Sequence, residues 1–171
     1  MLTIRPTKML AKRLRMEVPA DVPVVANRLA DWCAHEFRFG RYRYLMFCNT
    51  ASLYPVVMMA TGVTDGVKLA ARMMGGLQTC LKGEGLEDVF ERQIVTEMPD
   101  VQWAPIPGRS VLGSMNDLIY MAQCRLADGE DSPVDLSRRV ARTPLSLHGM
   151  NSPEDVFRQI AGLPKSTRRW W

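Results

Sequence analysis

The residues with the clearest potential for binding chemistry form a segment of alternating arginine and tyrosine, Arg41-Tyr42-Arg43-Tyr44. Side chains alternate between the two faces of a strand, so we expect the arginines on one face and the tyrosines on the other. Arginine binds phosphate groups, and an aromatic ring can stack on a nucleic-acid base. The pattern fits equally well a strand whose tyrosines belong to the core and whose arginines are solvated.

A second candidate is the beginning of a long predicted helix near Arg109 and Ser110. The first N–H groups of a helix have no partners within the helix, and together with these two side chains they would form an anion site. Further along, Asn116, Tyr120 and Gln123 fall on one line of the helix surface, because they are spaced by four and three residues. In the alternative interpretation, Ser110 only caps the helix and Arg109 pairs with an acidic residue.

Proton transfer would depend on His35 or Tyr120, since histidine is the usual acid–base group near neutral pH and a tyrosine hydroxyl can also carry a proton. Histidine in such a position is also commonly a hydrogen-bonded structural residue. The catalytic candidates are therefore His35 and Tyr120. The ligand-binding candidates are Arg41, Arg43, Asn49, Arg109, Ser110 and Asn116.

The sequence lacks the common motifs for metals and cofactors. It contains no Walker A loop, no G-x-G-x-x-G, no H-E-x-x-H and no G-x-S-x-G. Two histidines, His35 and His148, provide little from which to build a zinc site or a two-metal site. We expect neither a metal nor a cofactor, and the sequence argues against a metallohydrolase.

Cysteine usage and the N-terminus predict the cellular compartment. The four cysteines, Cys33, Cys48, Cys80 and Cys124, lie tens of residues apart without a C-x-x-C pair, so we expect four reduced thiols in the core. The N-terminus has no apolar region typical of a signal peptide, and no apolar stretch approaches the roughly 20 residues that a bilayer span needs. These features predict a cytoplasmic protein without a membrane partner.

The net charge of +4 is unevenly distributed along the 171 residues. Residues 1–43 carry nine Lys or Arg and four Asp or Glu, residues 44–107 carry four against seven, and residues 108–171 carry nine against seven. The basic first quarter could meet phosphates or an acidic partner, but a solvated face would show the same excess. The excess matters for binding only if Arg41 and Arg43 share a surface with Arg109.

Three apolar runs between residues 32 and 60 are the elements that position the arginines. Gly40 and residues 49–52 separate these runs with turn signals, which predicts a three-stranded antiparallel meander. Pro55 lacks a backbone N–H, so we expect its strand at an edge of the sheet or with a bulge.

The whole pattern predicts a single α+β domain over residues 1–163. A composition of 47% hydrophobic and 23% charged residues is that of a globular protein and excludes a disordered chain. Helices that begin near Asp65 and Ser110 are expected to cover the antiparallel sheet. Residues 164–171 form a basic tail that we expect to be frayed.

Three groups of residues form a recognisable pattern: Trp32…His35…Phe37…Arg41…Phe47…Asn49…Ser52, then Arg109-Ser110-Val111-x-Gly113-Ser114-Met115-Asn116-Asp117, and finally Pro153-Glu154-Asp155-Val156-Phe157. With this pattern the chain resembles a family of small bacterial proteins of unknown function over residues 2–162. The block R-S-V-x-G-S-M-N-D is the most specific part of the resemblance. The family implies no established activity for this chain.

Our first functional hypothesis is a cytoplasmic binding or regulatory module for an anionic ligand. In it, Arg41, Arg43 and Arg109 meet a nucleic-acid backbone or a nucleotide phosphate. A second hypothesis is a metal-independent enzyme that acts on a phosphodiester or a nucleotide, with His35 or Tyr120 as the proton carrier. The enzyme requires that these groups reach one reacting atom, so it fails if the helix start and the arginine-bearing strand lie on opposite sides.

A third hypothesis is a protein-interaction subunit, the partner of a neighbouring gene product. It would use an exposed surface of Met58-Met59 and Met73-Met74, because methionine adapts to different partners. Methionines of this number also commonly fill a hydrophobic core.

Overall fold

The computed structural model describes residues 1–98, 100–129 and 132–167. The strands are β1 (Leu2–Pro6), β2 (Asp31–Phe39), β3 (Tyr42–Asn49), β4 (Pro55–Met59) and β5 (Val101–Trp103). The α-helices are α1 (Lys8–Arg13), α2 (Gly66–Gly83), α3 (Glu87–Val89), α4 (Arg109–Ala127), α5 (Pro133–Ala141) and α6 (Pro153–Ile160). Shorter helical turns are η1 (Arg28–Ala30), the π-helical η2 (Phe90–Ile94), η3 (Val95–Glu97) and η4 (Ser146–His148).

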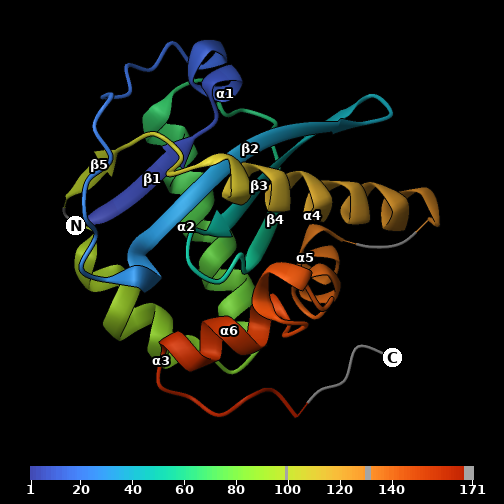
Figure 1. The fold of residues 1–171 in the computed structure, drawn as a ribbon. Coiled ribbons are helices and arrows are strands. Elements are labelled where there is room, and N and C mark those ends of the chain that lie inside the picture. The colour runs from blue at the N-terminus through green and yellow to red at the C-terminus, as the bar shows by residue number, and fades with distance from the viewer. Residues whose placement is uncertain (99, 130–131, 168–171) are drawn as a thin grey trace.

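The five strands form one mixed sheet in the order β4-β3-β2-β1-β5 (Figure 1). The predicted meander is confirmed, because β2, β3 and β4 pair antiparallel, with His35 opposite Met46. Pro55 lies on an edge strand, as its missing N–H requires. The sheet is extended by β1, which pairs parallel with both β2 and β5. The fold is thus an α+β domain whose β5-β1-β2 portion is parallel.

The predicted covering helices lie on opposite faces of the sheet. On one face, Trp32 and Phe47 form a core with Leu77 of α2. On the other face, Phe37 and Met46 form a second core with α4 and α5 residues, including Leu118. Figure 1 shows α4 in front of the sheet and α2 behind it. A side chain on β2 or β3 therefore faces α2 or α4 according to its place in the strand alternation.

Helix α2 packs closely on β4 because residue 76 is a glycine. A Cβ atom at Gly76 would lie 2.8 Å from Met58 Cγ and 2.9 Å from Val56 Cγ1, closer than carbon atoms pack. The neighbouring Gly75 is exposed, and a Cβ atom there would meet nothing within 4 Å. The two adjacent glycines thus differ: packing explains Gly76 and leaves Gly75 unexplained.

The exposed edge of β4 is protected against pairing with another strand. Pro55 has no N–H to offer, and the N–H of Val57 donates to the hydroxyl of Ser137 on α5 at 2.7 Å. The carbonyl of Met59 accepts a hydrogen bond from Arg72 on α2. Side chains of α5 and α2 therefore form hydrogen bonds with backbone groups on this edge.

The structure corrects two expectations about sulfur-containing residues. Cys33, Cys48 and Cys80 are buried, but Cys124 is exposed because it lies on the outward side of α4. Met73 is fully buried, and Met58, Met59 and Met74 are half-buried against the two cores. The exposed methionine surface of the third hypothesis is therefore wrong.

The residues after α6 return to the domain in part. Lys165 Nζ donates to Asn151 Oδ1 at 2.7 Å, and the N–H of Ser166 donates to Asp155 Oδ1 at 3.0 Å. Residues 168–171 of the predicted tail lie outside the described residues. Within the described ranges, no helix has both the length and the apolar composition needed to cross a bilayer.

Candidate functional site

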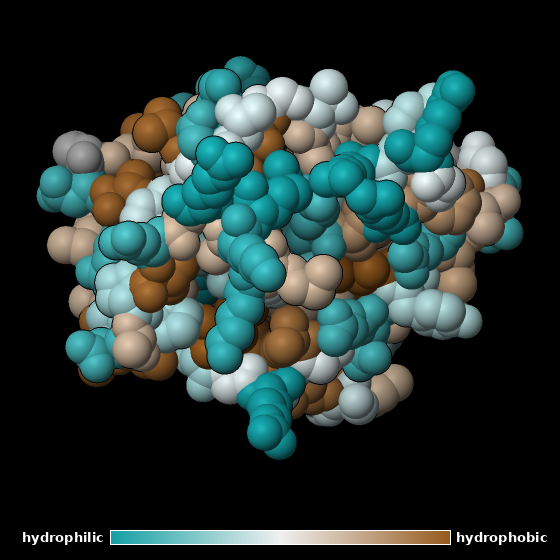
Figure 2. Space-filling model, turned by 90° about the horizontal axis from the view of Figure 1, so that it is seen from above, coloured by the Kyte–Doolittle hydropathy of each residue, from teal (hydrophilic) through white to brown (hydrophobic). Residues whose placement is uncertain are grey.

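One end of the molecule collects basic side chains from two segments. Helix α1, with the turn after it, packs against β1 and β2, and the β2–β3 hairpin projects from the same end of the sheet (Figure 1). All but one of these side chains are exposed, and Arg13 is half-buried. Figure 2 shows the molecule from above, where hydrophilic side chains predominate. We call the following seven residues the basic surface: Lys8, Lys12, Arg13, Arg15, Arg38, Arg41 and Arg43.

A single carboxylate joins the two parts of the basic surface. Arg13 Nη2 of α1 lies 2.7 Å from Glu36 Oε2, and Arg43 Nη1 of β3 lies 3.6 Å from Glu36 Oε1. In the part of the chain that the structure describes, the other five cations of the surface have no ion-pair partner. The basic surface therefore keeps a strong positive excess.

The predicted strand of alternating arginines and tyrosines begins one residue later than its pattern, so Arg41 is not part of it. Strand β3 begins at Tyr42, and Arg41 lies in the turn that Gly40 makes with a φ of 57°. Tyr44 belongs to the core and stacks on Phe37 at 5.3 Å between ring centroids. Tyr42 is 46% exposed. Of the two tyrosines, only Tyr42 is accessible to a ligand.

Arg41 and Tyr42 form a local pair at the tip of the hairpin. Arg41 Nη2 donates to the hydroxyl of Tyr42 at 2.9 Å, and the guanidinium carbon lies 5.1 Å from the centroid of the Tyr42 ring. This cation–π geometry holds the guanidinium beside the ring. A cation and an accessible aromatic ring are thus presented together.

The start of α4 lies at the same end of the sheet as the basic surface. Pro6 of β1 pairs with Ala34 of β2, and Trp103 of β5 pairs with Ile4, so the carboxyl ends of these parallel strands point the same way. Helix α1 follows β1, and α4 follows β5 at Arg109. In open sheets with parallel strands, ligands commonly bind at this end.

Arg109 and Ser110 are both exposed in the first turn of α4. The N-cap residue is Gly108, and no side chain caps the helix, so Ser110 is not the cap. Arg109 has no ion-pair partner within the described part of the chain, which removes the acidic partner that the alternative interpretation required. The helix start therefore remains open to solvent.

Two of the predicted site residues come into contact on the α4 face of the sheet. His35 hydrogen-bonds to the side chain of Asn116, and its Nδ1 lies 2.8 Å from the carbonyl oxygen of Glu36. Burial lowers the pKa of His35, and these two hydrogen bonds oppose the shift. The imidazole is therefore held neutral and oriented at neutral pH.

The remaining polar residues of α4 follow the predicted line. Gln123 Nε2 donates to the carbonyl of Arg38 at 2.9 Å, so Asn116 and Gln123 both face β2. Tyr120 lies between them in sequence but is 69% exposed. The line of Asn116, Tyr120 and Gln123 thus serves mainly to hold α4 along β2.

Asn49 is used within the fold. It is fully buried, and its Nδ2 donates to the carbonyl oxygens of Arg28 at 2.8 Å and Asp31 at 3.1 Å. Its Oδ1 accepts from the N–H and the hydroxyl of Ser52. The two bonds with Ser52 hold the turn between β3 and β4, and the other two tie it to η1 and the start of β2, so we do not retain Asn49 among the ligand-binding candidates.

The predicted site residues do not converge on one cleft. Arg43 and Glu36 face the α2 side of the sheet, whereas His35 and Asn116 lie on the α4 side. Arg41 lies at the hairpin tip and Arg109 at the start of α4. Side chains on opposite faces of a sheet point away from each other, so Arg43 does not share a cleft with His35 and Asn116.

The sequence can be assigned to a family on its full pattern. Residues 3–156 match a domain of unknown function, DUF6933. The chain belongs to this family. Comparisons with curated proteins and with solved structures give no match. A family of unknown function is what the sequence resemblance implied, and it supplies no activity to transfer.

The DUF6933 domain also contains a buried ion network that the sequence interpretation missed. Glu84, at the end of α2, pairs with Arg138 at 2.9 Å and with Arg142 at 2.7 Å. Glu154 of α6 pairs with Arg142 at 3.1 Å and with Arg158 at 3.2 Å. The available signal was the four-residue spacing of Arg138 with Arg142 and of Glu154 with Arg158, which places each pair on one helix face.

This network holds α2, α5 and α6 of the DUF6933 domain together. Burial opposes the charge of Arg142, but Glu84 and Glu154 raise the pKa of its guanidinium. A polar hollow of about 280 Å³ adjoins the network, but the carboxylates already neutralise Arg138 and Arg142 there. We assign these residues to packing. In the described ranges, no group of three or more His, Cys, Asp or Glu side chains is placed to hold a metal ion.

Proposed function

We propose that this protein binds nucleic acid and contacts the phosphate backbone through the basic surface. The observation that carries the proposal is that α1 and the β2–β3 hairpin lie side by side, joined by the ion pairs of Glu36 with Arg13 and Arg43. Together they present the seven cations of the basic surface. Nucleic acids release counterions when lysine and arginine neutralise their phosphates, and this release drives binding without base contacts. A positive charge excess of this size on one surface fits a polyanionic ligand.

The hairpin tip supports a nucleic-acid ligand over a small anion. Arg41 would meet a phosphate group, and the exposed part of the Tyr42 ring would stack on an unpaired base. The side chain of Arg38 adds an exposed cation on the adjacent strand. A cation beside an aromatic ring is the usual means of holding single-stranded nucleic acid.

The dispersed arrangement of cations also favours a polymeric ligand. Arg43 faces the α2 side of the sheet, and Arg109 begins the helix on the other side, yet both belong to the same end of the molecule. A polymer can contact both positions, whereas a single reacting atom cannot. This supports a binding module over the enzyme hypothesis. We place the protein in the cytoplasm, where its four free cysteines stay reduced.

Fluorescence anisotropy with labelled oligonucleotides tests this proposal. We would compare single-stranded and duplex DNA of about 20 nucleotides with free ATP as a competitor. Replacing Arg38 and Arg41 together with glutamine should weaken oligonucleotide binding about tenfold or more, and so should replacing Lys8 and Lys12. ATP should compete poorly, because it offers few phosphates.

Lys82 provides a matched control, since it is exposed on α2 and pairs with Glu87 at 3.1 Å away from the basic surface. The Lys82→Gln variant should bind oligonucleotides as the wild type does, within about twofold. Losses that follow only the number of charges removed, with Lys82→Gln costing as much per charge as the two double variants, would show only non-specific attraction to net charge. That result, or an absence of oligonucleotide binding, would overturn the proposal.

A further inference from the structure

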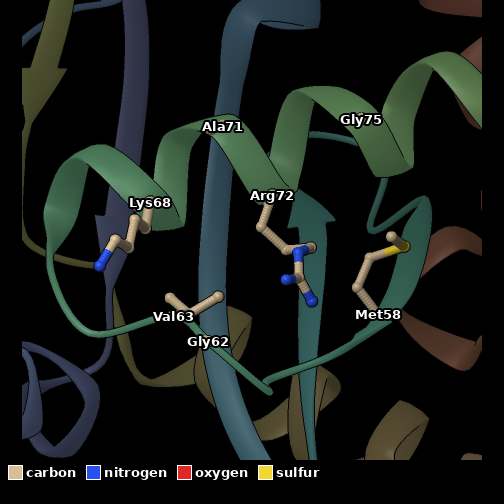
Figure 3. Close-up of a pocket in the computed structure, with 7 residues that line it drawn as sticks. All are labelled: Met58, Gly62, Val63, Lys68, Ala71, Arg72 and Gly75. Atoms are coloured by element: carbon tan, nitrogen blue, oxygen red, sulfur yellow. The ribbon is translucent and has the colours of Figure 1, made fainter.

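A second hollow lies between α2 and the β4 edge strand, next to Arg13 of the basic surface, which donates to the carbonyl of Val63 at 3.0 Å. It has a volume of about 430 Å³. Figure 3 shows α2 above it, with β4 and the loop after β4 below. Its lining residues are Met58, Gly62, Val63, Lys68, Ala71, Arg72 and Gly75. The hollow thus combines two cations with apolar side chains and a bare stretch of helix, a composition typical of small-molecule sites.

Arg72 supplies a positive charge without a carboxylate to balance it. Its Nη1 donates to the carbonyl of Met59 and its Nη2 donates to the carbonyl of Thr61 at 2.9 Å. Within the described residues no acid pairs with it. Figure 3 shows its guanidinium directed from α2 towards β4 and the loop. A guanidinium has five N–H donors, so donors remain after these two hydrogen bonds.

Lys68 differs from Arg72 in both position and pairing. Its Nζ donates to the hydroxyl of Thr64 at 2.8 Å and lies 3.5 Å from Asp65 Oδ2. In Figure 3 it occupies the other end of the hollow and points away from Arg72. The net positive charge of the hollow therefore resides at Arg72.

Gly75 is the observation that points to a ligand. It lies in the interior of α2, and glycine is among the poorest helix formers. A Cβ atom there would meet nothing within 4 Å, so no packing contact requires glycine, in contrast to Gly76. Its exposed backbone forms part of the hollow wall between Ala71 and Met58. A ligand that approaches the helix closely would account for the missing side chain.

We propose that this hollow binds a small organic anion. The carboxylate or phosphate group of the ligand pairs with Arg72, and its hydrocarbon part lies on Met58, Ala71 and Gly75. The two anionic groups share the chemistry that a guanidinium recognises, namely paired oxygen acceptors in a plane or fork. A neutral molecule of the same shape lacks that interaction and should bind much more weakly.

Titration of the full chain, followed by ¹H–¹⁵N correlation spectra, tests the inference. The probes are hexanoate, hexyl phosphate and the neutral isostere hexanamide. One of the two anions should shift the amide signals of Gly62, Val63 and Gly75 saturably below about 20 mM, and hexanamide should bind at least about tenfold more weakly. Comparison of hexanoate with hexyl phosphate distinguishes a carboxylate ligand from a phosphate ligand.

Two variants and a control make the test specific. Arg72→Gln should weaken binding of the preferred anion about tenfold or more. Gly75→Leu should fill the hollow and abolish binding, while the melting temperature rises because leucine favours the helix. Gln78→Leu places the same side chain on an exposed position of α2 that does not line the hollow, and binding should stay within about twofold.

The results that overturn the inference are equally defined. They are an absence of saturable shifts at Gly62, Val63 and Gly75 with both anions, equal binding of hexanamide, or unchanged affinity in a folded Gly75→Leu variant. Because Gly75→Leu is expected to gain stability, it decides the matter even if Arg72→Gln disturbs the loop that Arg72 holds.

Discussion

Asn116 on α4 hydrogen-bonds to His35 on β2, and this contact joins two residues that lie far apart in the sequence. With the hydrogen bond from Gln123 to the carbonyl of Arg38, it aligns α4 along β2. The histidine therefore lies between a strand and a helix rather than in an open cleft. Its surroundings allow the first of our predictions, which concerns its protonation.

The imidazole of His35 should titrate below its ordinary pKa of 6.5, because burial disfavours the charged form. NMR of the imidazole Cε1–H signal measures this, with the His35→Gln spectrum as the assignment control. Asn116→Leu keeps the site covered but removes a hydrogen bond that favours the charged form, so the pKa of His35 should fall further. A midpoint at or above 6.5 in the wild type would contradict this account.

The same histidine should make stability depend on pH in a defined direction. Its folded-state pKa is lower than its unfolded-state value, so between the two values the unfolded chain binds more protons. The contribution of neutral His35 is complete above about pH 6.5 and is lost as the pH falls towards the folded-state pKa. Urea unfolding at about pH 7.5 and about pH 5.5 should show a smaller loss in His35→Gln than in the wild type.

Glu154 should be a strong determinant of stability. It is 1% exposed and accepts hydrogen bonds from Arg142 and Arg158, so among the described residues Glu154→Gln leaves the half-buried Arg158 without an ion-pair partner and Arg142 with Glu84 alone. The expected loss in the free energy of unfolding is about 3–5 kcal/mol, measured by urea denaturation. Glu87→Gln breaks an exposed pair with Lys82 and should cost less than about 1 kcal/mol. Similar losses in the two variants would refute the assigned role of the network.

Alanine substitutions at the two adjacent glycines of α2 should change the free energy of unfolding in opposite directions. Gly76→Ala brings a methyl group against Met58 and Val56, and we expect a loss of about 1–3 kcal/mol in the free energy of unfolding. Gly75→Ala meets no neighbour and should gain up to about 1 kcal/mol from helix propensity. Thermal and urea unfolding measure both. Destabilisation by Gly75→Ala would show that packing constrains this position after all.

Cys124 should be the reactive thiol of the native protein. It is exposed on α4, whereas burial raises the pKa of Cys33 to about 12 and keeps its thiol protonated. Ellman's reagent should therefore modify Cys124 rapidly, and the fast phase should disappear in Cys124→Ser. Persistence of that phase in the variant would place a reactive thiol elsewhere.

Local patterns predicted much of the fold. The turn at Gly40 and the alternating runs on either side of it specify a hairpin, and Pro55 specifies an edge strand, because both act through neighbouring residues. The parallel pairing of β1 with β2 and β5 has no such signal. The strands of a parallel pair are joined by long connections, so no turn residue marks the register.

The candidate site was predicted less completely, because it too depends on contacts between segments that lie far apart in the sequence. The alternation of β3 could place Arg43 on a face, but it could not show that α1 packs beside that face and adds Lys8 and Lys12 to it. Asn49 has the chemistry of a ligand-binding residue, but its side-chain amide already forms hydrogen bonds with buried groups of the fold. Which polar residues remain free depends on tertiary packing.

The central claim is that the basic surface neutralises nucleic-acid phosphates. Its most direct test is the salt dependence of oligonucleotide affinity. On duplex DNA the slope of log K against log salt should be about −0.9 for each phosphate contacted, and the Arg38→Gln, Arg41→Gln double variant should reduce the slope by about 1.8. Affinity that does not change with salt, or a slope that is the same in the double variant, would contradict the claim.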